Sequence, residues 1–201
     1  MNKKLFILTC AALALCFSSC TKNEKPSDST GDDNKEPEVP EYRLLENFEE
    51  GGMLTWTGAD GCSFEIADNP SAKGINTSAK VGKVTAGGAQ WEFTWSTFFG
   101  SNENPDYLAF SKDGYVVKVD VYAPKASVPV YLKIEGDNVP AVEITDVTTS
   151  KVNEWETISF DYEPKQVVDG AYRNFVILFD AGVTTDGGEV FYYDNIRLCK
   201  E

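Results

Sequence analysis

Three large aromatic side chains alternate with polar ones in the segment QWEFTWS, where Trp91, Phe93 and Trp95 are spaced by two. Alternate residues of a β-strand point to the same face, so a strand here would carry the three rings side by side. An exposed indole can stack on the C–H face of a sugar ring while nearby polar groups bond its hydroxyls. Trp91 and Trp95 are therefore candidates for a sugar platform, with Phe93 expected in the core. Burial of all three rings in a core is the alternative, because aromatic side chains bury large areas.

Four other aromatic residues are candidates for the same kind of site: Trp56, Tyr107, Tyr122 and Tyr131. Trp56 lies in an expected early strand, where both platform and core stay open. Tyr107 ends a loop of Asn, Asp and Pro residues that could close over a ligand, although such residues are also ordinary turn formers. Tyr122 and Tyr131 fall on the expected non-core faces of their strands, where a solvated sheet face is the simpler interpretation for the neighbouring lysines.

The elements that must hold these side chains are short strands almost throughout. Apolar and polar residues alternate at a period of two between clusters of Gly, Asn, Asp and Pro, which is typical of strands joined by turns. A turn or two of helix is expected only around 78–81. Many short strands at near-regular spacing predict an all-β chain, an antiparallel β-sandwich or barrel. The expected strands are 43–48, 55–57, 63–67, 81–85, 91–96, 115–122, 128–135, 141–150, 154–162, 174–182 and 189–199.

The N-terminal segment has the pattern of an export leader. Lys3 and Lys4 precede an apolar run that is too short to span a bilayer, and small residues follow it. The end of this run, CFSSC, resembles a bacterial lipobox, which implies cleavage before Cys20 and lipidation of that residue. Residues 1–19 are therefore expected to be a lipoprotein signal peptide. A plain secretory peptide with Cys20 left free is the alternative.

Residues 20–41 are expected to form a disordered acidic tether. This stretch has no aromatic residue and only one bulky aliphatic residue, Val39, so it cannot bury enough apolar surface to offset its chain entropy. A flexible chain of this length spans roughly 25 Å and would hold a folded head away from a membrane. The remainder, 42–201, suits a single domain with one core.

The net charge of -14 argues against nucleic acid and anionic headgroups as ligands, because those ligands require Lys and Arg patches. Contact with a membrane is therefore expected through the lipid anchor only. Acidic residues soon after the lipidated Cys resemble the surface-export signals of some Gram-negative lipoproteins. This resemblance implies an outer-membrane location facing the cell exterior.

Three stretches of the expected domain together resemble carbohydrate-binding jelly-roll modules of the galactose-binding-like type. LLENFEEGG is similar to their opening strand, and FYYDNIRL is similar to their closing strand. Between them, DNPSAKGINTSAKVGKV is similar to a segment of modules from secreted glucan-degrading systems. The resemblance covers nearly all of 42–201 and implies a jelly-roll β-sandwich. Such modules occur attached to glycoside hydrolases or alone as lipid-anchored glycan binders, and this chain resembles the second kind.

The same resemblance implies a structural calcium ion. Glu49 matches the Glu of the family's opening motif and Asp194 the Asp of its closing motif, and such carboxylates hold the ion together with backbone carbonyls. A period of two also places Asp194 on the face of Ile196 and Leu198, where a carboxylate is costly unless neutralised. Oxygen ligands suit Ca²⁺, and the absence of His disfavours zinc or copper. A surface Asp bonded to turn amides is the alternative.

Two cysteines, Cys62 and Cys199, remain in the expected domain. Outside the cytoplasm they could form a disulfide. They could equally be two small buried hydrophobic residues, and the sequence does not supply the geometry that decides between these.

No pattern of catalytic residues is visible. A chain without His has no Ser-His-Asp triad or Cys-His pair, and no phosphate-binding loop occurs. Carboxylates are abundant, but the compact E-x-D-x-x-E signature of jelly-roll glucanases is absent. We therefore expect a non-catalytic, lipid-anchored surface protein that captures a polysaccharide, with a β-glucan as one candidate, beside surface hydrolases and transporters. The alternatives are a structural or adhesive lipoprotein that binds a protein partner and an unrecognised glycoside hydrolase.

Overall fold

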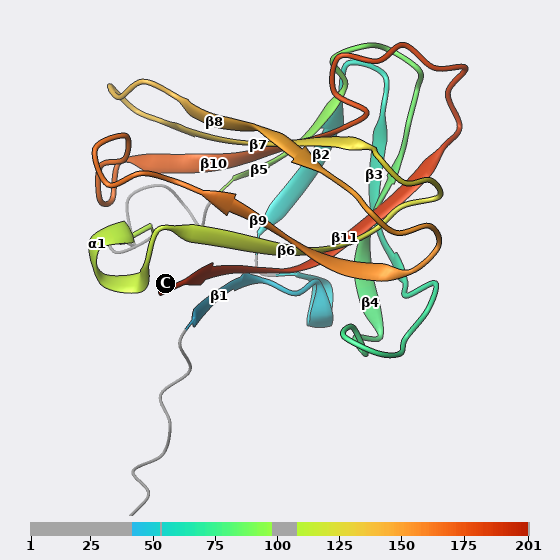
Figure 1. The fold of residues 1–201 in the computed structure, drawn as a ribbon, viewed down its shortest axis with the longest axis horizontal. Coiled ribbons are helices and arrows are strands. Elements are labelled where there is room, and N and C mark those ends of the chain that lie inside the picture. Colours follow the sequence, from blue (N-terminus) through green and yellow to red (C-terminus); the bar gives the residue numbers. More distant parts are fainter. Residues whose placement is uncertain (1–41, 53, 98–107, 201) are drawn as a thin grey trace, which may run out of the picture. The chain divides into compact units, whose positions relative to one another are not determined.

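A computed structural model describes residues 42–52, 54–97 and 108–200, which form two antiparallel β-sheets packed face to face (Figure 1). The expected all-β sandwich is confirmed. Besides the strands, these residues hold a short α-helix, α1 (Phe110–Asp113), and a 3-10 turn, η1 (Glu49–Gly51).

The two sheets are called sheet A and sheet B. Sheet A has the order β3-β4-β11-β6-β9, with β1 also paired to β11, and sheet B has the order β2-β5-β10-β7-β8. The strands of sheet A are β1 (Tyr42–Glu46), β3 (Ser63–Asp68), β4 (Lys80–Thr85), β6 (Val116–Tyr122), β9 (Trp155–Asp161) and β11 (Val190–Cys199). Those of sheet B are β2 (Thr55–Ala59), β5 (Phe93–Thr97), β7 (Pro129–Gly136), β8 (Val142–Thr148) and β10 (Tyr172–Phe179).

Each strand expected from the alternating pattern is present, with its ends shifted by a few residues. The helix expected around 78–81 is wrong. Lys80 already begins β4, and the Ser78 amide donates to the Asn76 side chain over 3.1 Å in the preceding turn. An Asn side chain that bonds the backbone two residues later favours a turn over a helix.

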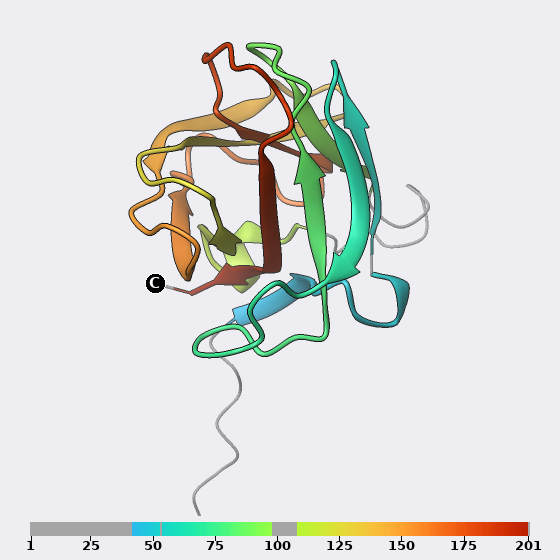
Figure 2. The same ribbon diagram turned by 90° about the vertical axis from the view of Figure 1, so that its right-hand side faces the viewer.

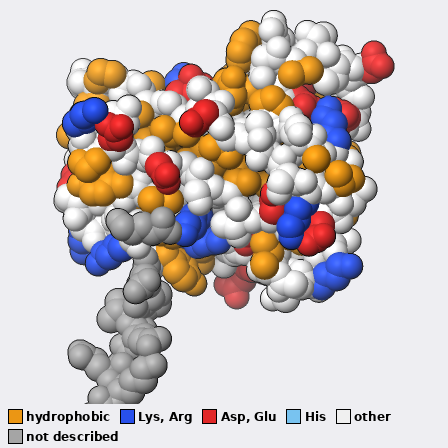
Figure 3. Space-filling model, viewed as in Figure 1, with side chains coloured by type: hydrophobic (Ala, Val, Ile, Leu, Met, Phe, Trp, Pro, Cys, Tyr) orange, Lys and Arg blue, Asp and Glu red, His pale blue; other side chains and the backbone are white. Residues whose placement is uncertain are grey.

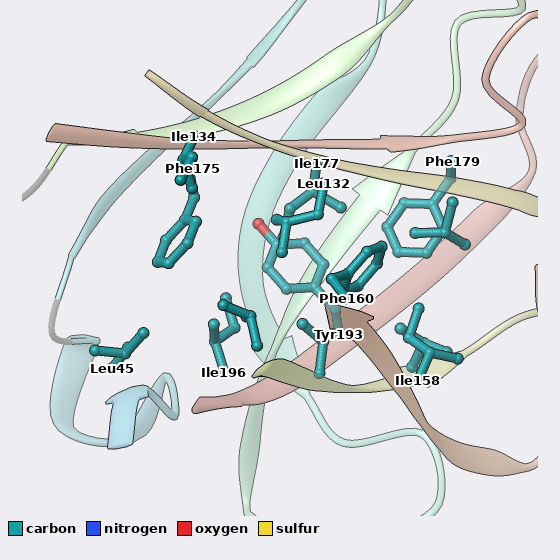
Figure 4. Close-up of a cluster of buried hydrophobic side chains, with 14 of the residues drawn as sticks. Leu45, Leu132, Ile134, Ile158, Phe160, Phe175, Ile177, Phe179, Tyr193 and Ile196 are labelled. Carbon is teal, nitrogen blue, oxygen red and sulfur yellow. The ribbon is translucent and has the colours of Figure 1, made fainter. Parts of the chain in front are cut away.

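The core lies between the sheets and is built from the inward side chains of both. Figure 4 shows Phe175, Ile177 and Phe179 of β10 pointing toward Tyr193 and Ile196 of β11. All five are buried. Burial of side chains of this size stabilises the fold by roughly 1.5–3 kcal/mol each, so the core fixes how the sheets face each other.

A β-bulge in β11 changes which of its side chains face the core. Tyr193 and Ile196 both point inward, Asn195 has a φ of 49°, and the pairing of β11 with β6 shifts after Asp194. A bulge adds one residue and so reverses the alternation of the strand. Asp194 therefore does not share the face of Ile196, as a strict period of two predicted. It lies on the outer side of sheet A, where Asn76 from the loop before β4 reaches it.

Two loops lie side by side at one end of the sandwich (Figures 1 and 2). One joins β4 to β5 and the other joins β10 to β11. The Ala86 amide donates to the Glu189 carbonyl over 2.9 Å, and the Gly188 amide donates to the Ala86 carbonyl over 2.7 Å. The Thr185 amide donates to the Gly88 carbonyl over 3.2 Å. These bonds make the paired loops one ordered unit at the entry to β5.

The face seen in Figure 1 carries a strip of apolar side chains between the two layers (Figure 3). Lys, Arg, Asp and Glu side chains are scattered around this strip, so both signs of charge occur there. Within the part of the chain that the structure describes, no helix has the length and apolar character needed to cross a membrane.

Candidate functional site

Strand β5 turns its aromatic residues outward and its polar residues inward. Phe93 and Trp95 are half-buried on the outer face of sheet B, whereas Thr94 and Ser96 are buried on the core face. This is the reverse of the usual pattern, in which the apolar face of a strand meets the core. The rings therefore lie at the surface although inward burial would remove more apolar area from water.

The inward polar side chains of β5 have hydrogen-bond partners in the core. The Thr94 hydroxyl lies 3.3 Å from the Tyr193 hydroxyl. The Phe175 amide donates to Ser96 Oγ over 3.2 Å. A slip of one residue would exchange the two faces of the strand, and these bonds would be lost. The register of β5 thus holds its rings outward.

A groove runs along β10 on the outer face of sheet B. Its floor is Asn174, Val176 and Leu178, and longer side chains of β5 and β7 form its walls. Val176 pairs with Trp95 on one side and with Lys133 on the other. The groove has a volume of about 350 Å³, near the lower end of the roughly 300–1,000 Å³ of small-molecule sites. Its lining residues are Phe93, Trp95, Lys133, Glu135, Glu143, Asn174, Val176 and Leu178.

Polar side chains of β7 and β8 stand along one wall of this groove. Lys133 Nζ lies 2.5 Å from Glu135 Oε1, and Glu143 pairs in register with Lys133. One cation and two carboxylates leave this wall with a negative charge, which disfavours polyanionic ligands. Asn174 adds an amide that both donates and accepts. The wall can therefore bond hydroxyl groups of a neutral ligand.

Trp91 stands at the Leu178 end of the groove, just before β5. Its side chain is 52 % exposed, and its ring centroid lies 6.4 Å from that of Tyr131. Gly182 lies against the indole, since a Cβ there would be 3.4 Å from Trp91 Cη2. Two hydrogen bonds of 2.9 Å join Gln90 to Gly182. The φ of Gly182 is 82°, a conformation that favours glycine.

The structure brings together three of the residues predicted to contact a sugar. Trp95 lines the groove, and Tyr131 pairs in register with Leu178 of its floor. The Trp91 ring, from the loop before β5, lies next to that of Tyr131. Their contact with a sugar stays a prediction. The expectation that Phe93 belongs to the core is wrong, because Phe93 stands beside Trp95 on the outer face.

Trp56 is not part of this surface, and its prediction as a sugar-stacking residue is wrong. Its side chain is 8 % exposed and belongs to the core between the sheets. Its Nε1 donates to Glu46 Oε2 over 3.1 Å. Glu46, itself fully buried, also accepts from the amides of Asn47, Phe48 and Leu54. The indole thus helps to satisfy a buried carboxylate, which is a structural role.

The two remaining predicted tyrosines do not join the groove. Tyr122 lies on β6 of sheet A, with its ring in edge contact with Trp155 and Tyr192 at 5.6 and 5.8 Å. The prediction that it shares a site with Trp95 is wrong, because the two residues belong to different sheets. Tyr107 lies outside the described residues.

The predicted calcium ligands, Glu49 and Asp194, both contact the loop between β3 and β4. Glu49 Oε1 accepts from the amides of Ala79 and Lys80 over 2.7 and 3.1 Å. Asp194 Oδ2 accepts from Asn76 Nδ2 over 2.8 Å. The two carboxylates are thus tied to neighbouring positions of one loop.

Asp194 has an unusual environment for a carboxylate. It is 0 % exposed, and its Oδ1 has no hydrogen-bond partner. Burial raises the pKa of Asp194 to about 6, against hydrogen bonds from Ser78 and Asn76 that lower it. A partnerless buried oxygen is the kind of atom that a hard cation accepts as a ligand. The donor type therefore fits calcium, with Asp194 and Glu49 as the residues that would hold it.

Other protein carboxylates do not complete such a site. Among the described residues, no group of three or more His, Cys, Asp or Glu side chains could hold a metal ion. Calcium takes about six to eight oxygen ligands. A calcium ion beside Asp194 would therefore depend on backbone carbonyls and water for most of them.

The two cysteines of the domain are not joined by a disulfide. Cys62 is buried, and its Sγ donates to the Phe93 carbonyl over 3.1 Å. Burial raises the pKa of this thiol, so it stays protonated and unreactive. Cys199 is also buried. Of the two interpretations left open by the sequence, the structure shows small buried residues and no disulfide between them.

An ion cluster at the ends of the β10–β11 loop was not foreseen from the sequence. Lys125 Nζ lies 2.9 Å from both Asp180 Oδ2 and Glu189 Oε2. Burial raises the pKa of Asp180, whereas the hydrogen bond from Lys125 lowers that of Glu189. The cluster fixes the loop that carries Gly182. The three charged residues are distant in sequence, so no local pattern pointed to them.

The two sheets and the groove define the chain as a two-layer antiparallel β-sandwich with aromatic side chains on an outer face. No protein-family model matches the chain, and no curated protein matches it in sequence. Solved structures with a similar fold are carbohydrate-binding modules. The resemblance to such modules is thereby confirmed for the fold.

Three of these structures come from Clostridium thermocellum. The CBM22-1–GH10 modules of xylanase 10B complexed with xylohexaose align with a TM-score of 0.51 at 15 % identity, over 80 % of this chain and 29 % of that chain. A family 11 module in complex with a β-1,3-1,4-mixed-linked tetrasaccharide gives 0.49 at 13 % identity, over 79 % and 95 %. The C-terminal family 22 module of Xyn10B gives 0.49 at 19 % identity, over 82 % and 96 %.

Proposed function

We propose that this protein binds a polysaccharide in the groove on sheet B and does so without catalysis. The observation that carries this proposal is the orientation of β5, with Phe93 and Trp95 at the surface and Thr94 and Ser96 in the core. A strand that exposes rings and buries hydroxyls forgoes hydrophobic stabilisation, and an aromatic binding surface gives a reason for that arrangement.

Stacking on the rings and hydrogen bonding to the opposite wall are the expected contacts. Trp95 and Phe93 offer apolar faces, while Lys133, Glu135 and Asn174 offer donors and acceptors across the floor. Two of the structures with a similar fold are complexes, one with xylohexaose and one with a β-1,3-1,4-mixed-linked tetrasaccharide. β-Linked glucans and xylans are therefore the first glycans to test.

The absence of catalysis is proposed from the charges near the groove. A glycosidase requires two carboxylates that flank the bond to be cleaved, one as acid and one as base or nucleophile. The two carboxylates that line the groove, Glu135 and Glu143, both stand on the wall formed by β7 and β8, so they do not flank a chain lying in the groove. Glu135 is also paired with Lys133, and Asp180 and Glu189 share Lys125. Release of reducing sugar from a β-glucan by the purified protein would favour a hydrolase instead.

Binding is tested by affinity gels and titration calorimetry with mixed-linkage β-glucan and xylan. Trp95→Ala is expected to weaken retention at least about tenfold, since 1.4 kcal/mol of lost contact is enough for that. Its melting temperature is expected to change little, because the ring lies outside the core. Tyr42→Ala is the matched control: it also removes an exposed ring, but from sheet A.

Two outcomes of this experiment would contradict the proposal. Retention of Trp95→Ala equal to that of the wild type would remove the groove as the binding surface. Equal losses in Trp95→Ala and Tyr42→Ala would show that binding does not depend on sheet B. Capture of a protein partner by the same rings, with no glycan bound, would favour the adhesive function.

We also propose that Cys20 carries the lipid and that the protein faces outward from the outer membrane. The support is the leader and the acidic tether, both of which lie outside the described residues. Many copies held at one surface would add avidity to weak single sites. A calcium ion at Asp194 and Glu49 is proposed as a structural clasp for the loop before β4, supported by the partnerless Asp194 Oδ1.

A further inference from the structure

We infer that the groove receives the end of a neutral saccharide chain, because two aromatic side chains close it at one end. This inference rests on the proposed function and specifies which part of the glycan is bound. The closing pair is Trp91 and Tyr131, called the end wall below. Tyr131 comes from the β7 side of the groove, and Trp91 comes from the loop that leads into β5.

The end wall stands where the floor of the groove ends. Tyr131 pairs in register with Leu178, the last outward residue of the floor. Beyond it, β10 stops at Phe179 and the chain turns. Gly182, in that turn, lies against the Trp91 indole. The indole therefore lies against the backbone that follows the floor.

The space between the two rings is too small for a sugar. Their centroids lie 6.4 Å apart with an interplanar angle of 46°. A sugar ring held between two aromatic faces needs van der Waals contact of about 3.5–4.0 Å on each side, so the faces must stand about 7–8 Å apart. A chain that follows β10 therefore stops at Trp91 and Tyr131.

The opposite end of the groove has a different character. There the lining changes from rings to the polar side chains of Asn174 and Glu135, which pair in register. A saccharide could enter over these groups and place its terminal sugar against the rings. The groove is thus polarised, with an apolar closed end and a polar open end.

Charge restricts the terminal sugar to a neutral one. The Lys133 ammonium, the cation that lines the groove, is held 2.5 Å from Glu135, and Glu143 adds a second carboxylate. A uronic acid would meet net negative charge without a free cation in the lining. Neutral hexoses and pentoses meet no such repulsion.

The test counts binding sites per gram of glycan. Soluble mixed-linkage β-1,3-1,4-glucan and xylan are each used intact and after partial acid cleavage, and the stoichiometry is measured by titration calorimetry. If chain ends are bound, a cleavage that multiplies the ends tenfold multiplies the bound protein per gram about tenfold. An unchanged stoichiometry per gram would show binding along the chain and overturn the inference while the proposed function stands. No binding to either form of either glycan would overturn both.

Trp91→Ala tests the end wall directly. This variant is expected to fold, because the side chain is half exposed. Without the indole, a glycan chain should be able to run past the end of the groove. The amount of Trp91→Ala bound per gram of intact glycan should therefore rise toward the amount bound per gram of cleaved glycan. If the amount of Trp91→Ala bound per gram still rises with the number of chain ends, Trp91 does not close the groove and the inference is wrong. Loss of all binding would also contradict the inference, because Trp91 would then be the stacking platform itself. Trp95→Ala serves as control and is expected to weaken binding to both forms alike.

Discussion

Asp194 combines complete burial with a carboxylate oxygen that has no partner, and we therefore expect this residue to respond to both pH and cations. Its Oδ2 is bonded to Asn76, and Asp120 lies opposite it on β6. Burial is the main cause of its raised pKa, and the nearby charge of Asp120 adds to it. The native protein therefore favours the protonated form of Asp194 more strongly than the unfolded chain does.

This difference sets the direction of a pH effect. The pKa of Asp194 is about 6 in the folded protein against an ordinary 3.8, so the folded state retains a proton that the unfolded chain has lost between these values. Stability from this group is highest at low pH and falls as the pH rises from about 4 to about 6. In chelator, Asp194→Asn is expected to become more stable than the wild type across this range and to keep the advantage above it, by about 1–3 kcal/mol. Thermal unfolding of both proteins from pH 4 to pH 7 measures it, and a difference that does not grow with pH would refute it.

Calcium should offset the loss of folding stability that the ionised Asp194 carboxylate causes. With millimolar CaCl₂ at pH 7, the wild type is expected to gain melting temperature and Asp194→Asn to gain none, because a bound cation stabilises only the state that binds it. Equal gains in both proteins would exclude Asp194 as a ligand. If neither protein responds, the calcium clasp is wrong.

At the scale of elements, the orientation of Trp91 depends on a loop that belongs to another part of the chain. The loop after β10 is held by Lys125 through Asp180 and Glu189, and it presents Gly182 to the indole. The end wall is therefore built by the paired loops as much as by β7. A change in this loop should alter binding without touching a lining side chain.

Gly182→Ala tests this dependence. A Cβ there would lie 3.4 Å from Trp91 Cη2, and alanine at a φ of 82° is strained, so a loss of about 1 kcal/mol in stability is expected. At this distance the methyl group only touches the indole, but relief of the strain in the turn should shift the ring that packs on it, which changes tryptophan fluorescence and lowers glycan affinity. Gly188→Ala is the matched control, since its φ is 81° and its Cβ would meet nothing within 4 Å. If both variants affect affinity equally, backbone strain explains the effect and the contact with Trp91 does not.

At the scale of the whole molecule, one weak site would gain from display in many copies on a surface. The expected anchor for that display is Cys20, followed by the tether of 20–41. In a Gram-negative host, the wild type is expected in the membrane fraction and labelled by a palmitate analogue, and Cys20→Ser in the soluble fraction without label. An unlabelled wild type that is still exported would support the plain secretory peptide. Protease treatment of intact cells then tells outward from inward display.

Much of this fold could be predicted from the sequence, because the alternation of apolar and polar residues along a strand involves only neighbouring residues. Apolar residues spaced by two marked the strands now seen as β6, β7 and β9, and Gly, Asn and Asp marked the turns between them. The face shared by Phe93 and Trp95 followed from the same period. The absence of His already removed several kinds of catalysis from consideration.

Which face of a strand meets the core was decided only by tertiary packing, because a period of two shows that side chains share a face but does not show what that face contacts. Phe93 and Trp95 lie outward since Thr94 and Ser96 have partners in the core. Trp56, an equally plausible platform in the sequence, lies inward. The bulge at Asn195 reversed the expected side of Asp194, and the contact of Trp91 with Gly182 joined loops that are far apart in the chain. The positions of the strands thus follow from residues that are adjacent in sequence, whereas the groove depends on contacts between residues that are far apart in it.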